Sequence, residues 1–147
     1  MTNDGAERAA DTFDVSVIVA AWKAAAFIEK AIASALASTG VRVEVIAVDD
    51  ASPDGTFATL QRLADADPRV TALRLLSNGG PSTARNLAIR NARGRFVAVL
   101  DADDAMEPGR LAQLVAAADA AKADIAVDNM TEVDEAGRPL SATPFLK

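Results

Sequence analysis

The chain has 147 residues, a formal net charge of −6, and neither histidine nor cysteine. Its length suits one domain with a full hydrophobic core, and its acidic balance argues against a nucleic-acid-binding surface. Without those two residue types it cannot form a disulfide, a zinc site of the usual kind or a catalytic pair that uses histidine or cysteine. Any metal would need oxygen ligands, which favours Mg²⁺, Mn²⁺ or Ca²⁺.

The first 13 residues are acidic and polar, which is unlike a signal peptide. No apolar run reaches the length of about 18 residues that a membrane-spanning helix needs. We therefore expect a disordered leader over residues 1–13 of a cytoplasmic protein without a transmembrane segment.

Short apolar runs alternate with helical patterns along the rest of the chain. The runs predict strands at 15–21, 43–48, 70–76 and 95–100, with a fifth strand at 124–128. Apolar positions at helical spacing predict helices within 27–36, 57–64, 84–91 and 111–118. A small hairpin is expected around 134–137. This alternation predicts an α/β fold whose sheet is parallel and covered by helices on both faces.

Right-handed crossovers place all the strand-to-helix loops at the carboxyl edge of such a sheet, where ligands bind. The polar residues of these loops should therefore gather in space. They are Trp22 and Lys23 after the first strand, Asp49 and Asp50 after the second, residues 78–82 after the third, and residues 101–104 after the fourth.

Three carboxylates, those of Asp101, Asp103 and Asp104, leave the fourth strand together and would repel one another. Helix capping is one explanation for Asp104, and equally for Asp54 before an earlier helix. It explains Asp101 and Asp103 less well, because they precede the next helix by too many residues. We therefore expect Mg²⁺ or Mn²⁺ at this point, shared with a substrate phosphate.

The glycine patterns that cradle phosphates are missing, since neither G-x-G-x-x-G after the first strand nor a P-loop occurs. The segment SNGGPS predicts a tight turn into a helix. Arg85, one turn inside that helix, could reach an anion near its N-terminus or be a solvated helix arginine. A diphosphate anchored by a metal, with carboxylates left for ribose or base, describes a nucleotide sugar better than a dinucleotide.

Four segments, in order and spacing, resemble the nucleotide-binding half of family 2 glycosyltransferases of the GT-A fold. They are VSVIVAAWKAAAFIEKAIASAL, VEVIAVDDASPDGT, GGPSTARNLAIRNARGRFVAVLDADD and EPGRL. The resemblance implies a Rossmann-like donor-binding domain over 14–130. It also implies truncation, with 131–147 as the start of a missing acceptor-binding half and the general base beyond Lys147. Glu132, Asp134 and Glu135 look like surface residues of the hairpin.

The resemblance also implies one nucleotide-sugar site at the carboxyl edge. Its donor-binding positions would be Ala20, Ala21, Trp22, Asp49, Asp50, Arg85, Asp101 and Ala102. Asp103 would hold Mn²⁺ or Mg²⁺ together with Asp101, and Asp104 would face the acceptor. Trp22 would lie near the base, although a core aromatic is the alternative. Asp50, with Asp49 as second choice, would accept the N3–H of a pyrimidine, and Asp101 would approach the ribose.

Two loops depart from the family's usual residues. Lys23 stands where the family commonly has asparagine, in a loop that usually begins with proline but here with Ala20. Ala51 replaces a usual glycine.

We therefore expect an inverting, metal-dependent glycosyltransferase fragment that takes a UDP-sugar donor and a glycan or lipid-linked acceptor in polysaccharide or cell-envelope synthesis. Peripheral contact with the inner face of the membrane fits that role, and an exposed apolar sheet face would favour homo-oligomers. Two alternatives remain. One is a non-catalytic sugar-nucleotide-binding or scaffold domain; the other is a Mg²⁺-dependent phosphohydrolase of the haloacid dehalogenase kind, because VAVLDADDA is similar to its first strand.

Overall fold

The computed structural model describes residues 12–134 and 136–140. The chain divides into two compact units, residues 1–112 and 113–147. Strands and helices alternate in the order β1 (Val15–Ala21), α1 (Ile28–Leu36), β2 (Val43–Asp49), α2 (Thr56–Ala66), β3 (Val70–Arg74), α3 (Pro81–Arg90), β4 (Phe96–Val99) and α4 (Arg110–Ala121). The predicted α/β class is confirmed, and α4 begins in the first unit and continues into the second.

The four strands form one parallel sheet in the order β3-β2-β1-β4. Ile18, near the middle of β1, lies opposite Ile46 of β2 and Val99 of β4. The chain first moves outward from β1 through β2 to β3 and then returns to place β4 on the other side of β1. In open sheets of this kind, the point where the order reverses leaves a crevice beyond the carboxyl ends of the strands. Here that point lies between β1 and β4.

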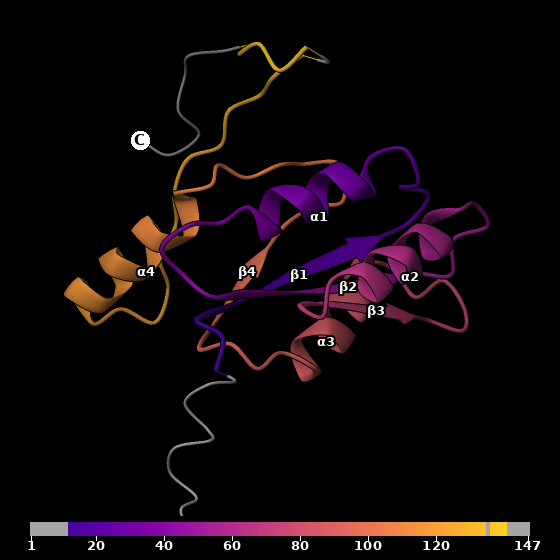
Figure 1. Ribbon diagram of the computed structural model, residues 1–147, viewed down its shortest axis with the longest axis horizontal. Coiled ribbons are helices and arrows are strands. Elements are labelled where there is room, and N and C mark those ends of the chain that lie inside the picture. The colour runs from indigo at the N-terminus through magenta and orange to yellow at the C-terminus, as the bar shows by residue number, and fades with distance from the viewer. Residues whose placement is uncertain (1–11, 135, 141–147) are drawn as a thin grey trace, which may run out of the picture. The chain divides into compact units, whose positions relative to one another are not determined.

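Helices cover both faces of the central strands, as the sequence predicts. Figure 1 shows α1 and α3 on opposite sides of the sheet. On the α3 side, Ala84 and Ala88 pack in one buried cluster with Ile18, Ile46 and Val48. The alanines let the helix backbone approach the sheet closely, while the β-branched strand residues fill the space beneath it.

The strand β4 is only partly covered. It pairs with β1, and no strand in the described ranges pairs with its other edge. Val97 and Val99 are 45% and 51% exposed, whereas Phe96 and Ala98 are half-buried. The prediction of a strand buried on both faces is therefore wrong for β4, because side chains of an edge strand alternate between a covered and an open face.

A buried carboxylate fixes the connection between α3 and β4. Glu44, the second residue of β2 and 1% exposed, accepts hydrogen bonds from the Ser16 hydroxyl at 2.7 Å and the Arg93 backbone N–H at 2.8 Å. The Arg93 guanidinium adds two more, at 2.9 and 2.7 Å. Gly94 follows at a close approach, since a Cβ there would lie 2.5 Å from the Ser16 nitrogen. These contacts set where β4 begins.

The second unit differs from the prediction at one point. Residues 124–128 form no strand, and Ile125 and Val127 are 80% and 71% exposed. The predicted fifth strand is therefore wrong. An apolar run becomes a strand only where a neighbouring strand offers backbone partners, and no described strand pairs with this one.

The predicted hairpin turn in the same unit is confirmed. Val133 and Pro139 form an antiparallel bridge, and Gly137, at φ +77°, donates its N–H to the Asp134 carbonyl at 2.8 Å. Glu135 and most of the predicted leader lie outside the described residues. Within the described ranges, no helix is long and apolar enough to cross a membrane.

Candidate functional site

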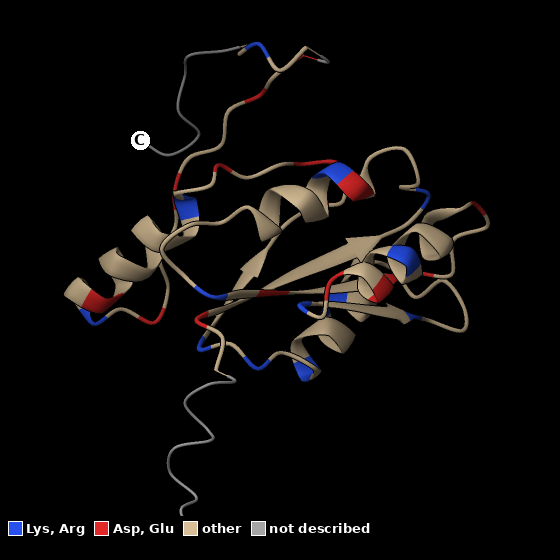
Figure 2. Ribbon diagram, in the orientation of Figure 1, with Lys and Arg blue, Asp and Glu red and all other residues tan. Residues whose placement is uncertain are grey.

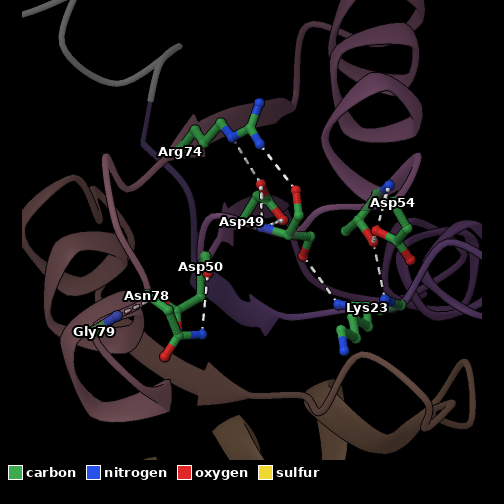
Figure 3. A network of polar contacts seen from close by, with 10 residues as sticks. Lys23, Asp49, Asp50, Asp54, Arg74, Asn78 and Gly79 are labelled. Carbon is green, nitrogen blue, oxygen red and sulfur yellow. Dashed lines mark hydrogen bonds and ion pairs between the residues drawn. The ribbon is translucent and has the colours of Figure 1, made fainter.

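The candidate site lies in the first unit, in the loops that follow the carboxyl ends of the four strands. Figure 2 shows acidic residues along the connection that follows β4. Figure 3 shows the residues around the ends of β1, β2 and β3, with Asp49 and Arg74 facing each other and Asp50 directed toward Asn78 and Gly79.

Asp49, the last residue of β2, is fully buried. Its carboxylate lies 3.1 Å from Nε of Arg74, which ends the neighbouring strand β3 in register with it. The Ser52 backbone N–H donates to both oxygens, and Arg74 also donates to the Ser52 carbonyl at 2.9 Å. A buried charge needs such compensation. This arrangement holds the β2–α2 loop, and a ligand would find no exposed surface on Asp49.

Asp50 is 3% exposed and binds the turn before α3. Its two oxygens accept the backbone N–H groups of Gly79 and Gly80 at 2.7 and 2.8 Å, and its carbonyl accepts Asn78 at 3.3 Å. Gly80, at φ +81°, then leads into the helix at Pro81. The predicted tight turn is confirmed. The donors that precede α3 are directed at a carboxylate of the chain itself, not at an open anion site.

Asp54 holds the start of α2 from the position before the N-cap, which is Gly55. Its carboxylate accepts the Thr56 backbone N–H at 3.1 Å and the Thr56 hydroxyl at 2.6 Å. The Thr56 hydroxyl oxygen accepts the Ala24 N–H at 2.9 Å. These bonds, led by the Thr56 hydroxyl, lower the pKa of Asp54 below its ordinary value. The loops after β1 and β2 are thereby joined.

The loop after β1 exposes an aromatic ring and a cation. Ala20 is half-buried and Ala21 is buried, but Trp22 is 52% exposed. The alternative of a core aromatic is therefore wrong. Lys23 has a positive φ of +51° and donates its backbone N–H to the Ser52 hydroxyl at 2.9 Å. Its Nζ lies 4.4 Å from the centre of the Trp22 ring.

Arg85 joins the α3 side of the site to the end of β4. Its Nη2 lies 2.7 Å from Oδ1 of Asp101, and both side chains are partly exposed. Arg85 is therefore paired within the chain, and its contact with an anion stays a prediction. Arg85 Nε is buried and has no hydrogen-bond partner among the described residues. Ala102, next to Asp101, is buried.

The three carboxylates after β4 lie close together. The Asp104 N–H donates to the Asp101 carbonyl at 3.1 Å, which closes a turn. Partial burial, and then the negative charges of Asp103 and Asp101, raise the pKa of Asp104 above its ordinary value. Helix capping does not explain Asp104, because α4 begins only at Arg110. Arg85 neutralises one of these charges, and the others face solvent.

These residues fit a magnesium or manganese ion of the kind that a substrate helps to bind. No group of three or more potential ligands is arranged around a metal position in the part of the chain described. Mg²⁺ commonly takes only one or two carboxylates and completes its shell with water and substrate phosphates. Asp101 and Asp103 supply oxygen donors of that kind, and of the two only Asp101 forms an ion pair among the described residues, with Arg85.

Sequence reasoning missed Arg74, which neutralises Asp49. The parallel register of β2 and β3 would have predicted this contact, because neighbouring strands that end together bring their last residues side by side. Of the predicted positions, Arg85 and Asp101 are brought into contact. Asp49 and Asp50 instead bind neighbouring loops.

Comparisons with known proteins identify relatives of the chain. The model of the family "Glycosyl transferase family 2" matches residues 16–143. The succinoglycan biosynthesis protein ExoO of Rhizobium meliloti is 50% identical over 127 residues, which cover 86% of this chain but 36% of ExoO. The chain thus spans about a third of that relative.

Two solved structures are also similar. S. aureus TarS 1–349, in complex with UDP-GlcNAc, is 29% identical with a TM-score of 0.66, covering 73% of this chain and 31% of that one. The mannosyltransferase PcManGT from Pyrobaculum calidifontis, in complex with GDP-Man and Mn²⁺, is 32% identical with a TM-score of 0.65, covering 71% and 32%. The fold is therefore that of GT-A glycosyltransferases, and the chain belongs to glycosyl transferase family 2.

Proposed function

We propose that this chain binds the donor in an inverting, metal-dependent glycosyltransferase that uses a UDP-sugar and builds a polysaccharide or cell-envelope glycan. The observation that carries the proposal is the turn of Asp101, Asp103 and Asp104 at the end of β4, with Arg85 paired to Asp101. ExoO by its name acts in succinoglycan biosynthesis, and TarS binds UDP-GlcNAc. Family membership argues against the phosphohydrolase alternative.

Asp103 and Asp101 would hold Mn²⁺ or Mg²⁺, which when bound would neutralise the diphosphate of the donor. Arg85 keeps Asp101 oriented through their 2.7 Å contact and carries a second N–H, on Nε, that has no partner among the described residues. Asp104, beside them, would face the acceptor hydroxyl. Partial burial, and then the charges of Asp103 and Asp101, raise its pKa above the ordinary value.

The base would bind between the ends of β1 and β2, and Asp101, which follows β4 on the other side of β1, would approach the ribose. Trp22 offers an exposed ring on which a base can stack. Asp50 retains acceptor capacity for the N3–H of a pyrimidine, because a carboxylate has about four lone-pair positions and its two backbone donors use only two. Asp49 remains the second choice, since it is fully buried.

Calorimetric titration of the 147-residue chain with UDP, with Mn²⁺ or with a chelator, tests this proposal. We expect UDP to bind more tightly with Mn²⁺, and Asp103→Asn to remove that difference. Asp65→Asn, an equal change of charge on an exposed position of α2, is the control and should behave as wild type. Equal UDP affinity with and without the metal would contradict metal dependence. Absence of UDP binding under both conditions would contradict the assignment of a uridine donor.

A further inference from the structure

Lys23 is held in a conformation that its residue type disfavours. It directly follows β1 and Trp22, and its φ of +51° is one that glycine and asparagine adopt more readily than lysine. Hydrogen bonds on both sides fix the loop there, from the Lys23 N–H to Ser52 and from the Ala24 N–H to Thr56. The loop after β2 therefore determines where this lysine is placed.

The charge of Lys23 has no carboxylate partner among the described residues, in contrast to the other cations of this edge. Arg74 is paired with Asp49, and Arg85 with Asp101. The Lys23 ammonium instead lies over the Trp22 ring, 4.4 Å from its centre. A ring face attracts a cation without using up its N–H donors. These donors stay available to an anion that enters the site.

The point where the strand order reverses, between the ends of β1 and β4, is where an anionic ligand would meet this lysine. The two strands pair up to Ile18 and Val99, so Lys23 after β1 and Asp101 after β4 both follow shortly after the paired region. A diphosphate that shares a metal with Asp101 and Asp103 would therefore lie beside the β4 loop. It would have the β1 loop opposite.

We propose that Lys23 is a donor-binding residue that contacts the diphosphate of the nucleotide sugar and gives it an affinity that does not depend on the metal. The inference rests on the proposed function, because the diphosphate comes from that donor. An ammonium that has only N–H donors to offer gains most from phosphate oxygens and little from a neutral base.

The test compares UDP with uridine, which lacks the phosphates, by calorimetry in the presence of a chelator and of Mn²⁺. The variants are Lys23→Gln, which keeps a side chain of similar length, and Lys23→Arg, which keeps the charge. Arg90→Gln is the matched control. It removes one exposed positive charge at the C-terminal end of α3, the end of that helix remote from the Asp50 contacts.

We expect Lys23→Gln to weaken UDP binding about tenfold, the effect of losing one hydrogen bond to a charged group, and to leave uridine binding within about twofold. Lys23→Arg should retain most of the affinity, and Arg90→Gln all of it. An unchanged UDP affinity in Lys23→Gln, or an equal loss for UDP and uridine, would overturn the diphosphate contact while leaving the proposed function intact. Failure of the wild type to bind either ligand would overturn both.

Discussion

Replacement of Glu44 by glutamine should destabilise the fold without touching the candidate site. The substitution keeps the volume of the side chain and one acceptor oxygen for Ser16 and the Arg93 backbone. It replaces the second oxygen, which accepts two bonds from the Arg93 guanidinium at 2.9 and 2.7 Å, by an amide that is itself a donor. Two charge-assisted hydrogen bonds are therefore lost in a position that is 1% exposed.

The expected loss of unfolding free energy is about 2 kcal/mol. A hydrogen bond to a charged group contributes about 1.5 to 3 kcal/mol. The two bonds share one guanidinium whose side chain is 55% exposed, so water can solvate this group after the change. The total loss should therefore lie near the lower end of the range for a single charged hydrogen bond. By contrast Glu29, in an exposed pair with Arg62, should contribute about 0.5 kcal/mol or less.

The loss should also depend on pH. Burial alone would raise the pKa of Glu44, but hydrogen bonds from Ser16 and Arg93, together with the Arg93 charge, bring it below its ordinary value of 4.5. The stabilisation by this carboxylate is therefore fully present above that ordinary value and is lost as the pH falls through the lower pKa of the folded state. The difference between wild type and Glu44→Gln should shrink in the same range.

Urea denaturation followed by circular dichroism, over a series of pH values, measures both effects, with Glu29→Gln as the matched control. Hydrogen exchange at the Arg93 and Gly94 amides adds a local measurement, since both donate into this cluster. The reasoning is refuted if Glu44→Gln loses no more stability than Glu29→Gln, or if its deficit is the same at acidic and neutral pH.

Three further predictions concern backbone conformation and the edge of the sheet. Gly94→Ala should cost about 2 to 3 kcal/mol of unfolding free energy, because its Cβ would meet β1 backbone atoms at 2.5 and 2.7 Å, whereas Gly55→Ala, with open space around it, should change little. Ala51→Gly should stabilise the fold by about 0.5 to 1 kcal/mol in the same denaturation assay, because Ala51 has a φ of +58°. Sedimentation at rising concentration should show self-association, because Val97 and Val99 are exposed on an edge strand. The double change Val97→Thr and Val99→Thr should reduce this self-association, and a wild type that stays monomeric at all concentrations would contradict the prediction.

The sequence predicts the central strands well because one local rule governs them. In β1 and β2, β-branched residues occupy both faces of a short run, and only a parallel sheet covered on both sides buries such a pattern. Residues 124–128 carry a similar run, but no described strand pairs with it. The difference between a strand and an exposed apolar segment therefore lies in the neighbours, which a local pattern does not contain.

In the candidate site, too, the sequence predicts which residues gather but not which of them pair. Topology alone gathers Asp50, Asp101 and Arg85 at the carboxyl edge, and the structure brings the last two into contact. Which carboxylate each cation chooses depends on distances between loops that are far apart in sequence. The pairing of Glu44 with Arg93 spans 49 residues, and the capture of the Gly79 amide by Asp50 spans 29, so neither follows from spacing.

The hydrogen bonds from the turn before α3 to Asp50 restrict which positions of this chain can change its donor preference. Acidic groups on the β2 side are bound to the chain itself, so a substitution there would disturb folding before it altered selectivity. The loops after β1 and β4 hold exposed side chains that can vary with little loss of stability. A library aimed at new nucleotide sugars should diversify the other positions of those two loops and keep Lys23, Asp49, Asp50, Asp101 and Asp103 constant.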